Sequence, residues 1–166
     1  GSSPPPTQII YLGNLASNWP ATWHPVLRHA PNGRDGNLWS VMPTAEGSYI
    51  VHHDGETWSV RTEQADHVGV GQDDTVMLAS AQKLWTFNGT GFAPVSPANN
   101  LIQVSLGDAD LVFARDSNNN VYSFSAGTLT QDTGLSAVVH IAASNDGTLW
   151  HAISGDPDMH RQLVNS

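Results

Sequence analysis

Three histidines and one glutamine recur along the chain at a nearly constant interval. His29, His67, Gln103 and His140 are 38, 36 and 37 residues apart, and each precedes an apolar position in a short run typical of a β-strand. Imidazoles held at one level could bind a divalent metal ion or an anion. The same side chains could also hydrogen-bond to nearby backbone as ordinary polar strand residues, which is the interpretation that we favour. The elements that carry these residues therefore have to be defined first.

The recurrence belongs to a longer repeat of about 37 residues. Its best-preserved part is a strand, an acidic turn and a second strand that contains a large apolar anchor. The anchors, spaced by 38, 36 and 37 residues, are Trp39, Met77, Phe113 and Trp150. A third strand follows each anchor, and a fourth follows Asp54-Gly55, Asn88-Gly89 or Ala126-Gly127. Asp-Gly and Asn-Gly dipeptides favour type I′ turns, so strands three and four are predicted to be antiparallel neighbours.

The repeat predicts an all-β fold, because no stretch of ten or more residues has a helical period. Four short antiparallel strands per repeat are typical of a propeller blade. The innermost strands of a propeller line its central channel, so the recurrent polar residues are predicted to line this channel as a polar ring: His29, His67, Gln103 and His140. We therefore expect a β-propeller of about four four-stranded blades in a single domain, residues 8–166, after a Pro-rich linker or tag remnant at residues 1–7. The chain starts and ends near the third strand of a repeat. Pairing of the N- and C-terminal strands could close the ring, or a second chain could complete a larger one as a homodimer.

Two copies of the acidic turn, Asp-Gly-Asn-Leu-Trp at 35–39 and Asn-Asp-Gly-Thr-Leu-Trp at 145–150, resemble tectonin repeats. The resemblance extends loosely over residues 8–166. Tectonin-type propellers are typically lectins or pattern-recognition modules for glycans on microbial or host surfaces. The resemblance therefore implies a lectin-like, carbohydrate-binding propeller, and we transfer no individual binding residue from that family.

Aromatic side chains are the natural candidates for sugar contacts, because the apolar face of a sugar stacks on an indole ring. Trp39 and Trp150 occupy the anchor position and are predicted to be core residues. Trp19, Trp23 and His24 lie in the one irregular stretch of the chain, and Trp58 lies on the presumed outer strand of its blade. These four residues are the predicted ligand-binding set, with packing at the ring closure as the alternative role for the two tryptophans of the irregular stretch.

The remaining polar motifs give no support to catalysis or to a metal cofactor. The recurring acidic turns around Asp73, Asp108 and Asp146 lack the spacing of an EF-hand, and Asp favours turns by bonding to its own backbone. The adjacent His52 and His53 should point to opposite faces of a strand, which disfavours a shared metal ion. The chain contains no Gly-x-Ser-x-Gly nucleophile motif and no cysteine. We predict no enzyme activity, no cofactor and no metal site.

The composition limits the classes of partner that the chain can bind. Six basic against fifteen acidic residues give a formal charge of −9, which opposes binding to nucleic acid, and no apolar run is long enough to insert into a membrane. The predicted function is a non-catalytic carbohydrate-binding module, an extracellular or cell-surface appendage of a larger protein. The alternatives are a protein-interaction scaffold and, with less support, a metal-binding or enzymatic propeller that uses the histidine ring.

Overall fold

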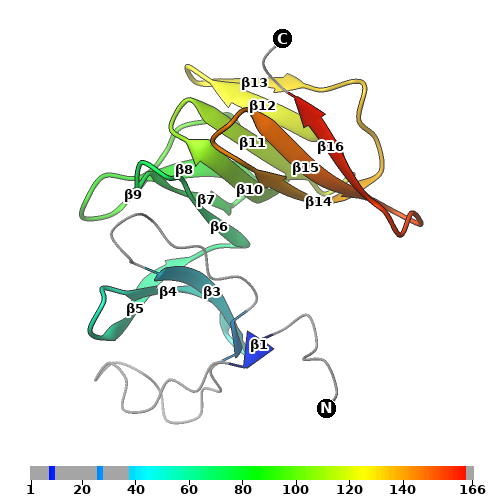
Figure 1. Cartoon of the computed structure of the whole chain (residues 1–166). Coiled ribbons are helices and arrows are strands. Elements are labelled where there is room, and N and C mark those ends of the chain that lie inside the picture. Colours follow the sequence, from blue (N-terminus) through cyan, green and yellow to red (C-terminus); the bar gives the residue numbers. More distant parts are fainter. Residues whose placement is uncertain (1–7, 10–25, 28–37, 164–166) are drawn as a thin grey trace.

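The computed structural model describes residues 8–9, 26–27 and 38–163, and these residues form β-strands, turns and loops with no helix. Fourteen of the strands, β3 to β16, build four antiparallel sheets, and β1 (Gln8–Ile9) pairs with β2 (Val26–Leu27) in a separate two-stranded sheet. The four sheets follow one another through space in chain order (Figure 1). The fold is therefore an all-β propeller, in agreement with the repeat in the sequence.

Each of the four sheets is one blade, made of strands that are consecutive in the chain. Blade 1 contains β3 (Leu38–Thr44), β4 (Gly47–His53) and β5 (Trp58–Gln64). Blade 2 contains β6 (His67–Val70), β7 (Val76–Ser80), β8 (Lys83–Phe87) and β9 (Phe92–Pro94). Blade 3 contains β10 (Leu101–Asp108), β11 (Leu111–Asp116), β12 (Val121–Ser125) and β13 (Thr128–Gln131). Blade 4 contains β14 (Val138–Ala143), β15 (Thr148–Ile153) and β16 (Met159–Leu163).

The outer hairpins join antiparallel neighbours, as predicted, but only one of them has the expected two-residue turn. Ala126 and Gly127 have φ angles of +49° and +79°, which is the type I′ pattern. The loops that begin at Asp54 and Asn88 have four residues, and Oδ1 of each first residue accepts backbone N–H groups two and three residues further on. This side-chain cap stabilises the longer loop, so the type I′ prediction is wrong for these two hairpins.

Consecutive blades pack face to face through apolar clusters that contain the anchor residues. The ring of Trp39 in blade 1 lies 5.1 Å from the ring of Phe87 and 6.0 Å from that of Phe92, both in blade 2. Met77 lies in the cluster between blades 2 and 3, and Phe113 lies in the cluster between blades 3 and 4. Each of these three anchors is only 4% exposed. The 37-residue period of the sequence is thus the period of blade-on-blade packing.

The fourth anchor is the exception. Trp150 is 41% exposed, and the guanidinium of Arg161 lies 5.9 Å from the centre of its ring. Met159 and Leu163 on the same face of blade 4 are also exposed. The prediction that Trp150 is a core residue is wrong, because no described blade follows blade 4 to cover this face.

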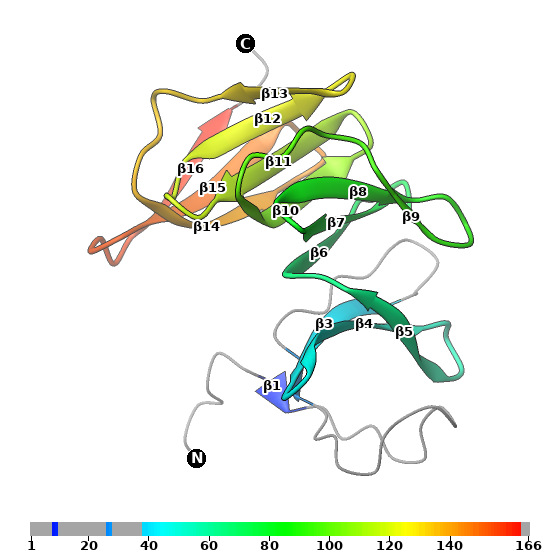
Figure 2. The same cartoon turned by 180° about the vertical axis from the view of Figure 1, so that it is seen from behind.

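The described strands do not include a pair between the two ends of the chain. β1 pairs with β2, and it lies at the opposite end of the array from β16 in both views (Figures 1 and 2). The described residues contain no helix that is long and apolar enough to cross a membrane.

Candidate functional site

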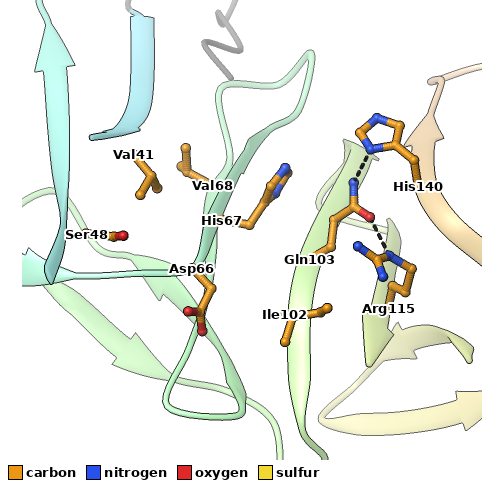
Figure 3. A pocket seen from close by; sticks show the side chains of 9 residues that line it. All are labelled: Val41, Ser48, Asp66, His67, Val68, Ile102, Gln103, Arg115 and His140. Carbon is orange, nitrogen blue, oxygen red and sulfur yellow. Dashed lines mark hydrogen bonds between the residues drawn. The ribbon is translucent and has the colours of Figure 1, made fainter. Parts of the chain in front are cut away.

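A cavity of about 420 Å³ lies where the inner strands of the blades converge. Its lining comes from blades 1 to 4 and consists of Val41, Ser48, Asp66, His67, Val68, Ile102, Gln103, Arg115 and His140 (Figure 3). We call this space the central cavity. Its volume falls within the range of about 300–1,000 Å³ that is typical of small-molecule sites, and its lining combines three aliphatic side chains with several hydrogen-bonding groups.

The central cavity brings together three of the four recurrent polar residues. His67 begins β6, Gln103 lies near the start of β10, and His140 lies near the start of β14. The pairing registers of β10 and β14 are irregular just before Gln103 and His140, respectively. Such bulges re-aim side chains, and here the residues that follow them line the cavity. His29, the fourth member of the predicted ring, lies outside the described residues.

Gln103 is the centre of a hydrogen-bond chain across the cavity wall. The Nε of Arg115 donates to Gln103 Oε1 over 2.8 Å, and Gln103 Nε2 lies 3.3 Å from the carbonyl oxygen of Ile141, to which it donates. These two contacts fix the orientation of the amide, because a flipped amide would set donor against donor and acceptor against acceptor. Gln103 is 2% exposed, so water cannot replace these partners without cost.

The same series of hydrogen bonds determines the protonation state of His140. Gln103 Nε2 lies 3.0 Å from His140 Nδ1, and since the amide nitrogen is a donor, Nδ1 must accept. His140 is then neutral, with its proton on Nε2. Desolvation at the cavity wall and, second, the positive charge of Arg115 lower the pKa of His140 below its ordinary value. Hydrogen bonding and electrostatics therefore favour the same neutral state.

Arg115 is the functional candidate that the sequence analysis missed. It pairs directly with Gln103 across β10 and β11, so the two side chains lie on one face of the blade. The positions equivalent to Arg115 are Ala79, opposite His67, and Ala152, opposite His140. The signal was present in the repeat: one of only six basic residues occupies a position that holds alanine in the neighbouring blades.

The predicted aromatic set is not gathered at the central cavity as far as the structure describes it. Trp58 is partly buried on β5, packs against the Met42–Val51 cluster, and lies edge-on to the ring of His53, with centroids 5.0 Å apart. It does not line the cavity. Trp19, Trp23 and His24 lie outside the described residues. His52 stacks on Trp39, on the opposite face of β4 from His53.

The described acidic turns are held by their own side chains. Asp146 Oδ1 accepts the backbone N–H of Thr148 over 2.9 Å, and Asp73 bonds through Oδ1 to the backbone of Thr75 and through Oδ2 to that of Ala109 in the next blade. These contacts are structural. In the described part of the chain, no group of three or more His, Cys, Asp or Glu side chains is arranged to hold a metal ion.

The sequence matches no protein-family model and no curated protein. Its structure is similar to a solved X-ray structure of a protein assigned provisionally as a gluconolactonase, with a TM-score of 0.61 and 12% sequence identity. The match covers 84% of this chain and 59% of that protein, so the chain spans less than two thirds of its length. At this identity the likeness establishes the fold alone, and it supports the β-propeller fold of the four consecutive blades.

Proposed function

We propose that this chain is a non-catalytic carbohydrate-binding propeller module and that the central cavity holds the sugar. The observation that carries the proposal is the lining: Asp66, His67, Gln103, Arg115 and His140 place donors and acceptors around one space of about 420 Å³. A sugar needs such groups for its hydroxyls and an apolar surface for its C–H face.

The apolar surface comes from aliphatic side chains that line the same cavity. Val41 and Val68 face it from blades 1 and 2, and Ile102 faces it from β10 (Figure 3). A second hollow of about 360 Å³ between blades 1 and 2 shares Ser48 and Asp66 with the central cavity. The two hollows together offer room for more than one sugar unit. The resemblance of the repeats to tectonins supports the same ligand class.

A glycan array followed by calorimetric titration of the hits tests the proposal. Gln103→Leu should abolish binding, because it removes the amide that orders Arg115 and His140. Gln162→Leu is the matched control, since Gln162 bonds to Asp132 away from the cavity. Trp23→Ala distinguishes the cavity from the irregular N-terminal stretch. An array without a reproducible hit would refute the proposal, and binding lost only in the Trp23 variant would move the site out of the cavity.

A protein-interaction role is the second candidate, and the exposed face of blade 4 favours it. Trp150 is 41%, Met159 54% and Leu163 65% exposed on one face. The equivalent faces of blades 1 to 3 are covered by the next blade. The mass of the protein in solution tests this role: a dimer that Trp150→Ala converts to a monomer would support it, and a monomer of the unmodified chain would argue against self-association.

The proposed setting of the module is the cell surface or the extracellular space, as an appendage of a larger protein. The resemblance of the repeats to lectin-type tectonins supports this proposal. Fractionation of the source cells, with detection of the protein by an antibody, tests it directly. Recovery of the protein only from the cytosolic fraction would refute this setting without affecting the binding proposal.

A further inference from the structure

The central cavity contains a partly buried cation whose hydrogen-bond acceptors among the described residues are neutral. The guanidinium of Arg115 donates to Gln103 Oε1 and, through Nη1, to Asn119 Oδ1, each over 2.8 Å. Both acceptors are side-chain amides. Among the described residues, no carboxylate forms an ion pair with Arg115. From this charge environment we infer that the cavity selects carbohydrates that carry a carboxylate, with Arg115 as the group that binds it; the inference rests on the proposed function.

The nearest acid compensates only part of this charge. Asp116 follows Arg115 in β11, and its field favours the charged guanidinium, while desolvation is the larger effect and lowers the pKa of Arg115. The two carboxylate oxygens of Asp116 accept four hydrogen bonds from residues 118–122, so they are already engaged. A cation removed from water without a bonded anion is costly, and a ligand carboxylate would lower that cost.

The fold itself does not require a cation at this position. Ala79 and Ala152 occupy the same place in the blades before and after, opposite the equivalent polar residues of β6 and β14. Blade geometry is therefore satisfied by a methyl group. Arg115 replaces it in the one blade where the recurrent polar residue is Gln103, whose amide oxygen can order the guanidinium.

The guanidinium retains donors for a ligand. Arginine has five N–H donors. Among the described residues, two of them bond to Gln103 and Asn119, which leaves Nη2 and the second proton of Nη1. His140 adds its Nε2–H at the same wall, because its Nδ1 is the acceptor for Gln103. Arginine binds carboxylates through parallel N–H groups, and such charge-assisted bonds are stronger than neutral ones. This wall of the cavity is thus built of donors.

The opposite side of the cavity has the complementary polarity. Asp66 precedes β6, and Figure 3 shows its carboxylate on the far side of the cavity from Arg115. Desolvation raises the pKa of Asp66, and no described cationic side chain forms an ion pair with its carboxylate. A carboxylate group can accept hydrogen bonds from sugar hydroxyls but repels a second carboxylate. The arrangement fits a saccharide with one acidic end toward Arg115 and hydroxyls toward Asp66.

Matched probes test this inference in the protein as it stands. Methyl β-D-glucuronide and methyl β-D-glucoside differ only in carrying a carboxylate or a hydroxymethyl group at C6. We expect calorimetry to give an affinity at least about tenfold higher for the glucuronide, which is about 1.4 kcal/mol. Arg115→Ala should remove the preference, so that the variant binds the two glycosides with equal affinity. Arg115→Lys should retain part of it, because lysine keeps the charge without the planar donor pair.

Arg161→Ala is the control, since it removes an equal charge from the exposed face of blade 4. It should leave the preference intact. Equal binding of the two probes by the unmodified chain would overturn the inference and leave the proposed function standing. Failure of every glycan on the array would overturn both. The comparison of the two probes on the unmodified chain needs no variant, so a poorly folded Arg115→Ala protein would not prevent the decision.

Discussion

The hydrogen bond between Gln103 and Arg115 gives the sharpest test of the cavity wall, through a double-mutant cycle on stability. Gln103→Leu removes a side chain that is 2% exposed and leaves the Nε of Arg115 without its acceptor. Arg115→Ala introduces the residue that blades 2 and 4 hold at the same position. If the two side chains stabilise each other, the double variant should lose less stability than the two single variants lose together.

The magnitude follows from the partners. A hydrogen bond to a charged group contributes about 1.5–3 kcal/mol, and a buried donor left unsatisfied costs about 1–3 kcal/mol. Since Gln103 also bonds to Ile141 and His140, we expect Gln103→Leu to cost about 2–3 kcal/mol after the gain from the leucine methyl groups. Arg115→Ala should cost about 1–2 kcal/mol, and the coupling energy should be about 1–2 kcal/mol.

Urea denaturation followed by tryptophan fluorescence measures all four proteins of the cycle. A parallel cycle between Gln162→Leu and Arg115→Ala supplies the control, because Gln162 bonds to Asp132 and not to the guanidinium. This control should be additive within about 0.5 kcal/mol. If the Gln103–Arg115 cycle is additive within the same margin, the two side chains are not coupled. The claim that their hydrogen bond orders the cavity wall would then be wrong.

Three further outcomes test the fold and its titration. Gly107→Ala should destabilise the protein by about 1–3 kcal/mol in urea denaturation, because a Cβ there would lie 2.6 Å from a backbone oxygen of blade 4. Gly91→Ala is the control and should be neutral, since a Cβ at Gly91 would have no other atom within 4 Å. Trp39→Ala should cost about 3–5 kcal/mol and Trp150→Ala less than about 1 kcal/mol, since 4% and 41% of these side chains are exposed; equal losses would contradict the assigned blade contacts. Because folding lowers the pKa of His140, the unfolded chain binds more protons than the folded chain at pH values between the folded pKa and about 6.5. The free energy of unfolding should therefore fall as the pH drops below about 6.5. A His140→Gln variant with an unchanged pH profile of stability would argue against this assignment.

The propeller could be predicted from the sequence because its packing is periodic. The anchors Trp39, Met77 and Phe113 are buried between consecutive blades, so the repeat reports the core directly. The burial of Trp150 could not be predicted in the same way. The sequence of a blade determines which face is apolar, whereas its cover depends on whether another blade follows. The repeat alone therefore predicts that Trp150 is buried, whereas no described blade covers it.

The turns show a second limit. Asp54-Gly55 and Asn88-Gly89 resemble two-residue hairpin turns, yet each begins a four-residue loop. The dipeptide is compatible with both geometries, and the choice depends on the residues that follow, whose N–H groups bond to the Asp or Asn side chain. Loop length is thus decided by side-chain capping and by strand register together, and the dipeptide alone determines neither.

The candidate site could be predicted from the sequence only in part, for a different reason. His67, Gln103 and His140 recur with the repeat, so their positions on the inner strands could be read from spacing. Arg115 departs from the repeat, and a search for recurrence passes over departures. In a repeat protein, recurrent residues mostly maintain the blade packing that every copy shares. A residue that breaks the repeat at a cavity has a role in one copy only, and ligand binding is such a role.

The fixed amide of Gln103 also determines what the cavity can recognise. Its oxygen holds Arg115 and its nitrogen holds His140 Nδ1, so this wall presents N–H donors from both neighbours. If His140 gained a second proton, Nδ1 would face the amide nitrogen as a donor, and relieving that conflict by flipping the amide would turn its nitrogen toward Arg115. Protonation of the histidine is thereby coupled to the position of the guanidinium. Carboxylate binding by Arg115 and the neutral state of His140 therefore depend on the same hydrogen bonds through Gln103.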